Sequence, residues 1–413
     1  MTIAAWSCLK DAKILDVSQL LPGPHAALAL SQLGADVIKV EQPNGGDTVR
    51  TMGRNAFAQL NHGKRCIALD LKSDAGRTAF LALAREADAV IEGFRPGVMD
   101  RLGLGYAQLS AANPRIVVCS ISGFGQSGPY SADPGHDLNY LALAGYWGVP
   151  AQMEDLVARP RVRISDYAAA AYASLALAVA IMSARQSGCG QHLDVSIHDS
   201  IFAWTAGAAW TARQALAAGH DTPGVMPDND IFQTADGRHM VLGIMENKFW
   251  LSLRDRLGAE FPELLSEAYA SRAQRQQHKR EVHALLNRIF ASRPLEAWRA
   301  EFEGTDVPFS PVLDATELFD DPHVKSRQVI RPLDGNATMA TRFPVKFSAG
   351  LADIPGRVAS VGQDNDAVLS AQGWPGRDVE RQTDLQGQDA TCHSVRIAQP
   401  GAADDTSTKR MTP

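Results

Sequence analysis

The sequence contains few cysteines, and they are scattered. The five cysteines form no CxxC pair, and no group of histidine and cysteine has the spacing of zinc ligands. Isolated thiols are typical of reduced, cytoplasmic proteins, so we predict a cytoplasmic location and no metal site. Positive charge is not in excess either, because the formal net charge is −6 at pH 7. Nucleic-acid binding, which needs clustered basic charge, is therefore not expected.

Two nucleotide-binding motifs are absent as well. The sequence has neither a GxGxxG fingerprint nor a Walker A loop, so NAD and ATP enzymes lack their usual signature. No basic segment followed by an apolar core stands near its start, so a signal peptide is not expected. Residues 167–184 form an uncharged run of 18, near the length of a membrane span. Because alanine dominates this run and no basic loop flanks it, we predict a buried core helix and no membrane partner.

The first 120 residues alternate between strand and helix patterns. The strand patterns occupy residues 13–18, 36–41, 88–94 and 115–125, and a turn, a further strand and a new helix are predicted within residues 187–200. Between the strand patterns of the first 120 residues lie a helix that begins near Pro24 and another capped by Ser73 or Asp74. Strands that alternate with helices predict an α/β fold, with a parallel sheet covered on both faces. In such sheets ligands bind at the carboxyl ends of the strands, so the loops that follow the strands are candidate site loops.

The pattern of the chain changes near Gly219. A turn-rich stretch with a predicted hairpin at 235–237 is followed by helices rich in charge. The last part is rich in polar residues and poor in apolar ones. We predict a large domain over residues 1–222, a smaller α+β domain over 223–330, a return to the large domain over 331–374 and a disordered tail over 375–413.

Three titratable residues stand at predicted helix starts beyond strand ends. His136 and Asp137 precede an apolar helix, and Asp166 precedes the alanine-rich helix. Each histidine or carboxylate has a structural alternative: Asp166 as a helix N-cap, and His136 as a helix-start residue bonded to a backbone carbonyl. Together, a histidine, a carboxylate and the free N–H groups of a helix start make a proton-transfer site. Periodicity alone does not show whether these groups meet.

Several stretches in order within residues 13–350 resemble the class III CoA-transferase superfamily, also called the L-carnitine dehydratase/bile-acid-inducible F type. They include "ILDVSQLLPGPHAALALSQLGADVIKVEQPNGGD", "VIEGFRPGVMDRLGLGY", "GHDLNYLALAG" and "QTADGRHMVLGIMENKFW". The resemblance implies a Rossmann-like large domain, a small domain and an interlocked homodimer. It also implies an acyl-CoA substrate and no prosthetic group.

Two activities share this family's fold. In CoA-transferases the aspartate at the position of Asp166 is a nucleophile, which becomes a mixed anhydride and then an aspartyl-CoA thioester. In α-methylacyl-CoA racemases the same aspartate is a base, paired with the histidine of "GHDxNYxxxxG", which is His136 here. The racemase pattern also matches Glu246, which orients the histidine, and the backbone N–H of Asp137 is our candidate donor to an enolate oxygen. We therefore expect a 2-methylacyl-CoA racemase or epimerase. The alternatives are a CoA-transferase acting through Asp166 and a non-catalytic acyl-CoA-binding protein.

Because CoA carries phosphate groups, we expect cationic side chains along its binding site. The resemblance assigns CoA binding to Lys64, Arg65, Arg95 and Arg101, together with His25 of the first loop. The alternative for these cations is ordinary surface charge. The family often has arginine where this chain has Gln42 and His62, which predicts a differently built phosphate site. The alanines that follow Asp166 predict a narrower acyl pocket near Tyr167.

Overall fold

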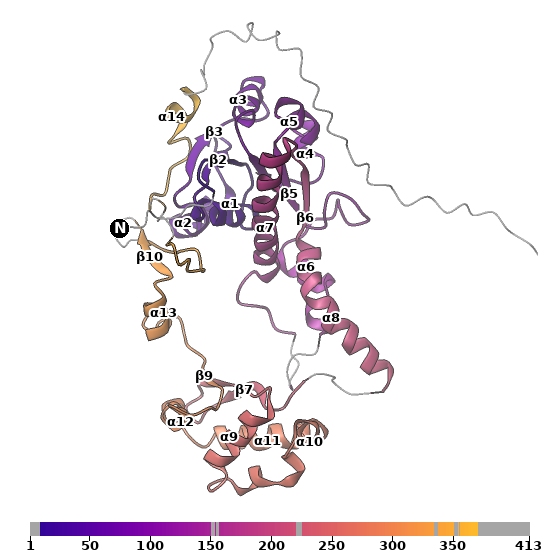
Figure 1. The fold of residues 1–413 in the computed structure, drawn as a ribbon, viewed down its shortest axis with the longest axis vertical. Coiled ribbons are helices and arrows are strands. Elements are labelled where there is room, and N and C mark those ends of the chain that lie inside the picture. Colours follow the sequence, from indigo (N-terminus) through magenta and orange to yellow (C-terminus); the bar gives the residue numbers. More distant parts are fainter. Residues whose placement is uncertain are drawn as a thin grey trace, which may run out of the picture. The chain divides into compact units, whose positions relative to one another are not determined.

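The structure is a computed structural model, and it describes residues 9–149, 153, 157–219, 225–333, 338–350, 354 and 356–370 (Figure 1). By its internal contacts the chain divides into residues 1–374 and 375–413. The tail predicted at 375–413 lies outside the described residues.

A six-stranded parallel sheet forms the centre of the first part of the chain. Its strands are β1 (Lys13–Asp16), β2 (Asp36–Glu41), β3 (Arg65–Ala68), β4 (Ala89–Glu92), β5 (Val117–Ser122) and β6 (His192–Ser196). Every neighbouring pair is parallel, in the order β3-β2-β1-β4-β5-β6. The predicted α/β fold with a parallel sheet is confirmed. The sequence patterns do not predict β3, because a strand of four residues that includes an arginine carries too short an apolar signal.

Helices cover both faces of this sheet. The helices are α1 (Pro22–Gln32) and α7 (Ile164–Ser187) on one face, and α3 (Asp74–Ala84) and α5 (Tyr106–Ala112) on the other. Successive strand residues point to opposite faces, so Ile14 lies in the cluster with α1 and α7 while Leu15 lies in the cluster with α3 and α5. Of the two predicted caps of α3, Ser73 is the one observed, since its Oγ accepts the N–H of Gly76 at 3.0 Å.

The alanine-rich run lies within α7. One side of this helix packs in the core through Ala169, Ala173 and Leu177, as expected of a core helix. The opposite side, which includes Leu175 and Val179, is exposed in the isolated chain. Among the described residues α7 is the one helix long and apolar enough to span a bilayer, a test that core helices also pass.

Residues 225–311 contain an antiparallel sheet with its own core. The strands β7 (Asn229–Gln233), β8 (His239–Gly243) and β9 (Phe309–Pro311) pair in that order. Gly237, with a φ of 75°, makes the predicted hairpin turn between β7 and β8. The helices of this segment are α9 (Asn247–Leu257), α10 (Arg272–Gln277), α11 (Lys279–Phe290) and α12 (Leu295–Phe302). Trp250, Phe290 and Trp298 are buried in its core, and the mixture of helices and antiparallel strands is the α+β pattern expected there.

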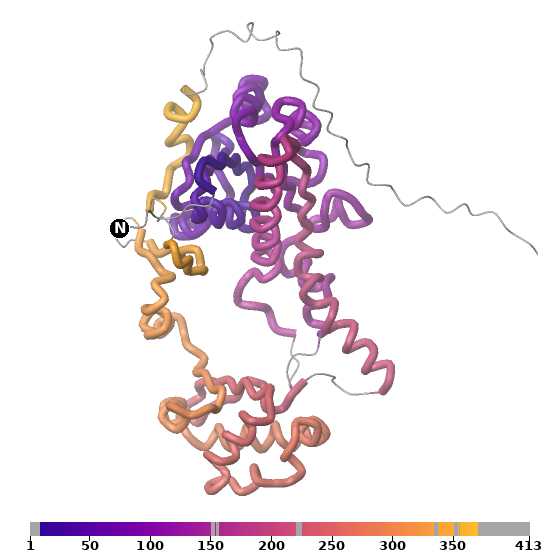
Figure 2. The backbone as a smooth tube through the Cα atoms, in the orientation of Figure 1, coloured from indigo at the N-terminus to yellow at the C-terminus, as the bar shows by residue number. Residues whose placement is uncertain are grey.

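The last described residues contact the first elements of the chain. These late elements are α13 (Pro322–Arg327), β10 (Ile330–Leu333), β11 (Thr338–Thr341) and α14 (Asn365–Leu369). Leu333 of β10 packs against Ala58 of α2 (Arg54–Asn61). Asp364, which precedes α14, accepts the backbone N–H of Cys66 in β3 at 2.8 Å. Figure 2 shows the yellow segment, which includes α14, beside the early part of the chain that contains β3.

Candidate active site

A cavity of about 450 Å³ lies at the carboxyl ends of the parallel strands. The sheet has a topological switch point between β1 and β4, where successive strands begin to be added on the other side of the sheet. The cavity is lined by residues 19, 20, 22 and 23 after β1, 93–96 after β4 and 121–123 at the end of β5. The starts of α6 (Asp137–Leu143) and α7 close it. This is the edge of the sheet at which the sequence predicts a ligand.

His136 and Asp166 both line this cavity, although 30 positions separate them in the sequence. His136 is the N-cap residue of α6, and its backbone N–H donates to the Asn139 side-chain oxygen at 3.0 Å. Asp166 lies in the first turn of α7 and is only 8% exposed. The N-cap of α7 is Arg163, so the alternative of Asp166 as an N-cap is wrong. The structure thus leaves the Asp166 carboxylate facing the cavity.

The side chain of Asp137 joins the two helix starts. Its Oδ1 accepts the backbone N–H of Ser165 at 2.9 Å and the Ser165 hydroxyl at 2.6 Å. The hydroxyl also lies 3.1 Å from the carbonyl oxygen of Asp137, to which it can donate. Because Asp137 follows His136 and Ser165 precedes Asp166, this contact joins the two helix starts that carry the cavity residues. The backbone N–H of Asp137, predicted to be an oxyanion donor, lies in the first turn of α6, where the helix offers it no acceptor.

The environment of Asp166 disfavours its charged form. Burial, followed by the nearby carboxylate of Asp137, raises the pKa of Asp166 to about 7, while the positive charge of Arg163 acts in the opposite direction. A carboxyl group with such a pKa exists as both acid and carboxylate near neutral pH, and pKa values perturbed by burial and a neighbouring charge are typical of functional sites.

Tyr140 fixes the loop that carries His136. Its hydroxyl donates to the carbonyl of Gly135 at 2.6 Å, and its ring packs closely on Gly123 and Gly135. A Cβ atom added to either glycine would lie within 2.8 Å of the ring. Sequence patterns gave no sign of this role, because a tyrosine in an apolar helix is ordinarily a packing residue.

Two arginines line the cavity beside Asp166. Arg95, predicted to bind CoA, follows β4, and Arg163 precedes α7. The other predicted arginines lie elsewhere: Arg65 pairs with Asp36 across β2 and β3, and Arg101 is an exposed residue of α4 (Val98–Arg101) outside the cavity lining. Of the four predicted cationic CoA contacts, Arg95 is therefore the one that the structure brings to the cavity.

Lys64 is buried, which corrects its predicted position on the path of CoA. Its ammonium group donates to Asp16 Oδ2, the Pro24 carbonyl and Asn61 Oδ1, each at 2.8 Å. Burial lowers the pKa of Lys64 to about 8, against the attraction of Asp16. His25 is likewise outside the cavity lining, and burial with the charge of Lys64 lowers its pKa to about 4. A neutral His25 supplies no charge to a phosphate group.

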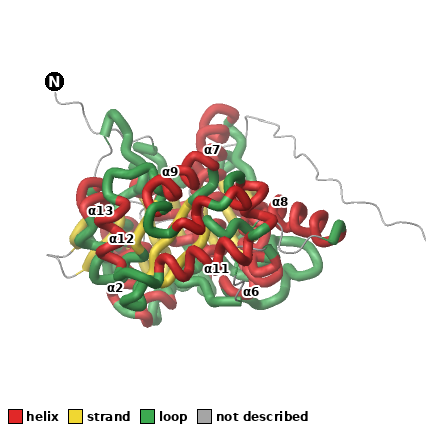
Figure 3. Tube along the Cα trace, turned by 90° about the horizontal axis from the view of Figure 1, so that it is seen from below, coloured by secondary structure: helices red, strands yellow, loops and turns green. Residues whose placement is uncertain are grey.

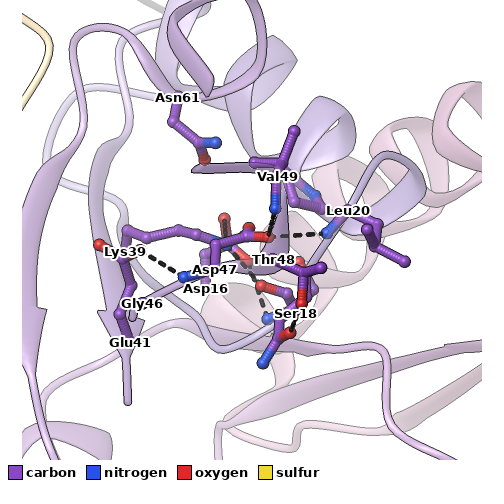
Figure 4. A network of polar contacts seen from close by, with 12 residues as sticks. Asp16, Ser18, Leu20, Lys39, Glu41, Gly46, Asp47, Thr48, Val49 and Asn61 are labelled. Carbon is purple, nitrogen blue, oxygen red and sulfur yellow. Dashed lines mark hydrogen bonds and ion pairs between the residues drawn. The ribbon is translucent and has the colours of Figure 1, made fainter. Parts of the chain in front are cut away.

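A second buried lysine organises the loop that follows β1. Figure 4 shows Lys39 beside Asp47. The two form an ion pair, in which Lys39 Nζ lies 2.8 Å from Asp47 Oδ2. The other oxygen of Asp47 accepts the N–H groups of Leu20 at 3.1 Å and Val49 at 3.0 Å. Leu20 lines the cavity with a φ of 66°, a left-handed conformation that is costly for a leucine. Asp47 thus holds one wall of the cavity in a strained conformation.

Glu246 does not line the cavity. It is the N-cap residue of α9, its side chain is exposed, and its carboxylate lies 3.9 Å from the ammonium group of Lys248. Its predicted role of orienting His136 stays a prediction. Of the positions at which arginine was expected, Gln42 is exposed and His62 is fully buried.

Comparisons with known proteins show the family of the chain. The model of CoA-transferase family III matches residues 9–365. The chain is 32% identical over 356 residues to an acyl-CoA transferase of Fusarium pseudograminearum, covering 82% of this chain and 77% of that protein. It is also 32% identical over 349 residues to the acetyl-CoA:oxalate CoA-transferase of Acetobacter aceti, covering 81% and 88%.

A solved structure shares the fold. The CAIB/BAIF family protein of Brucella suis superimposes with a TM-score of 0.77 at 28% identity, covering 89% of this chain and 99% of its own. The chain therefore belongs to CoA-transferase family III, and it is an enzyme of that family acting on CoA thioesters. The predicted family is confirmed.

Proposed function

We propose that the protein is a CoA-transferase that moves CoA between two carboxylic acids, with Asp166 as the nucleophile. The observation that carries this proposal is a buried carboxylate in a cavity at the switch point of the sheet, beside two arginines. The names of the relatives support it, because they describe transferases such as the acetyl-CoA:oxalate enzyme. This reverses our preference at the level of sequence, where the racemase came first.

The proposed reaction has four steps, and it begins and ends with an acyl-CoA thioester. The Asp166 carboxylate attacks the donor thioester, which gives a mixed anhydride and CoA thiolate. The thiolate attacks the aspartyl carbonyl of the anhydride, which gives an aspartyl-CoA thioester and releases the donor acid as its carboxylate. The acceptor carboxylate then attacks this thioester, forming a second anhydride and expelling the thiolate. Attack of the thiolate on the acceptor's carbonyl gives the new acyl-CoA and returns the Asp166 carboxylate.

The residues around Asp166 have defined parts in this proposal. Each tetrahedral intermediate carries an oxyanion, which the N–H groups at the start of α6 can receive, that of Asp137 among them. Arg95 supplies positive charge to the bound CoA. Asp137, through Ser165, keeps the attacking carboxylate at the cavity wall. No redox step occurs, so the reaction calls for no prosthetic group.

A second candidate function is isomerisation of 2-methylacyl-CoA. It is favoured by one observation, namely that His136 lines the same cavity as Asp166. Two acid/base groups at one cavity could remove a proton from one face of the α-carbon and return it on the other. None of the relatives compared above bears a racemase name.

One experiment separates the two activities. The enzyme is incubated in D₂O with a single enantiomer of 2-methylbutyryl-CoA, with and without ¹³C-labelled acetate, and followed by NMR. The transferase predicts labelled acetyl-CoA only when acetate is present, and an α-proton that stays in place. Exchange of the α-proton and appearance of both enantiomers without acetate would contradict the transferase and establish the isomerase. Succinyl-CoA serves as a second donor, in case the cavity rejects the branched chain.

We further propose that the active form is a homodimer. Exposed apolar side chains on α7 and on α8 (Ile197–Ala217) support this, among them Leu175, Val179, Trp204 and Trp210. In Figures 1 and 3 the outer end of α8 stands away from the strands of the sheet. Exposed apolar side chains gathered on neighbouring helices are typical of surfaces that bind another protein chain. Light scattering coupled to gel filtration tests this, and a mass of one chain at micromolar concentration would contradict it.

A further inference from the structure

Arg163, an exposed residue, and Arg95 are the two cations of the cavity lining, and neither has an ion pair among the described residues; Arg95 is assigned to CoA above. Arg163 lines the cavity that holds Asp166, three residues before it, at the N-cap of α7. The lysines and arginines described above are mostly committed to carboxylates, as with Lys39, Lys64 and Arg65. The cavity itself offers two carboxylates, Asp166 and the exposed Asp133.

We propose that Arg163 is a specificity-determining residue, which binds the second carboxylate of a dicarboxylic acyl group. This inference rests on the proposed function, since the first carboxyl carbon of that acyl group is the one that Asp166 attacks. A residue and its third neighbour at a helix start lie about 5–6 Å apart at Cβ, and the arginine side chain extends further. An acyl chain of four or five carbons spans a comparable distance between its two carboxyl groups.

The chemistry of the guanidinium group suits this task. Its planar fork of N–H donors matches a carboxylate in bidentate fashion, and it keeps its charge at every relevant pH. A methyl group at the same place would leave the guanidinium without a partner and displace its water. Arg163 should therefore favour a dicarboxylic acyl group over a monocarboxylic one of equal length, by about 10- to 100-fold, as one charged hydrogen-bonded pair provides.

The two ligands to be compared are succinyl-CoA and butyryl-CoA. Their acyl chains have equal length, but succinyl-CoA ends in a carboxylate and butyryl-CoA in a methyl group. We would compare Arg163→Met and Arg163→Lys with the control Arg161→Met, which alters an exposed arginine outside the cavity lining. Dissociation constants are measured by calorimetry in an Asp166→Asn background, which prevents turnover. Values of kcat/KM are measured in the enzyme with Asp166 intact, with acetate as the common acceptor.

The inference predicts a specific pattern. Arg163→Met should weaken binding of succinyl-CoA about 10- to 100-fold and leave butyryl-CoA unchanged, Arg163→Lys should fall between, and Arg161→Met should match the parent. An equal loss of binding affinity for both ligands, or a parent that binds succinyl-CoA no more tightly than butyryl-CoA, would overturn the inference. If binding follows the prediction but no CoA reaches any acceptor, the proposed transferase function fails while the assignment of Arg163 stands.

Discussion

The carboxylate of Asp137 accepts both the backbone N–H and the hydroxyl of Ser165. These two residues are 28 positions apart, and each is the direct neighbour of a cavity residue. The contact ties the start of α6 to the start of α7 and so fixes His136 and Asp166 at one cavity. It also brings a second negative charge near Asp166, which together with burial raises the pKa of that carboxyl group. One side chain therefore sets both the geometry and the electrostatics of the site.

Two substitutions of Asp137 separate these effects. Asp137→Ala removes the acceptor for two buried donors, so we expect a loss of about 1–3 kcal/mol in the free energy of unfolding and a fall in kcat of about 100-fold. Asp137→Asn keeps an oxygen at the same place and should retain most of both quantities. Chemical denaturation and steady-state kinetics measure them. An Asp137→Asn variant as damaged as Asp137→Ala would contradict the role of the oxygen in positioning.

The pH profile reports the protonation state of Asp166. Because the nucleophile must be a carboxylate, kcat/KM should rise about tenfold per pH unit below pH 7 and level off above it. Asp137→Asn removes a negative charge and should move the midpoint to lower pH. Arg163→Met removes a positive charge and should move it to higher pH. A flat profile between pH 5 and 8 in the parent enzyme would rule out this titration.

The same shift affects folding stability. A carboxyl group with a raised pKa holds its proton more tightly in the folded state, so its contribution is full below its unfolded pKa near 3.8 and is lost as the pH rises through about 7. Asp166→Asn removes the buried charge and should stabilise the fold at pH 8 by about 2–4 kcal/mol, with little effect at pH 4. Urea unfolding at the two pH values measures the difference. Equal effects at both would show that Asp166 is not buried as a charge.

The wall of the cavity formed by Leu20 depends on Asp47. Asp47→Ala would leave the buried Lys39 without its nearest carboxylate, at a cost of about 3–5 kcal/mol, and would free the N–H of Leu20. Asp47→Asn retains an oxygen for Leu20 but lacks the charge, so its loss of stability should be smaller. KM for acyl-CoA should rise more in Asp47→Ala than in Asp47→Asn. Thermal denaturation and kinetics provide both readouts, and unchanged KM in both variants would argue against a role of this wall in binding.

Much of the fold could be predicted from local patterns. Local patterns predicted five of the six parallel strands, all but β3, and Ser73 signalled the start of α3 because a cap acts on residues close in sequence. The position of the cavity followed from a general property of parallel sheets. The motif "GHDLNYLALAG" and the position of Asp166 identified two residues that the structure brings to one cavity.

The rest depended on contacts between distant residues. Lys64 looks like a surface cation in sequence, but its partner Asp16 is 48 positions away and no periodicity links them. The side chain of Asp137 was missed for the same reason, although a serine directly before Asp166 was a usable hint. Arg163 escaped notice because it is the third arginine of a short run with Arg159 and Arg161, which resembles solvated surface charge. The position of Arg163 in the cavity lining, which suggests its role, can be seen only in the structure.

The most direct test of the account is the mass of the enzyme after reaction with an acyl-CoA donor. The full chain is mixed with succinyl-CoA, quenched in acid and analysed by intact mass and peptide mapping. We predict a gain equal to CoA minus water, located on the peptide that contains Asp166, released by hydroxylamine and absent in Asp166→Asn. An unmodified Asp166 in an enzyme that still transfers CoA would contradict the central claim.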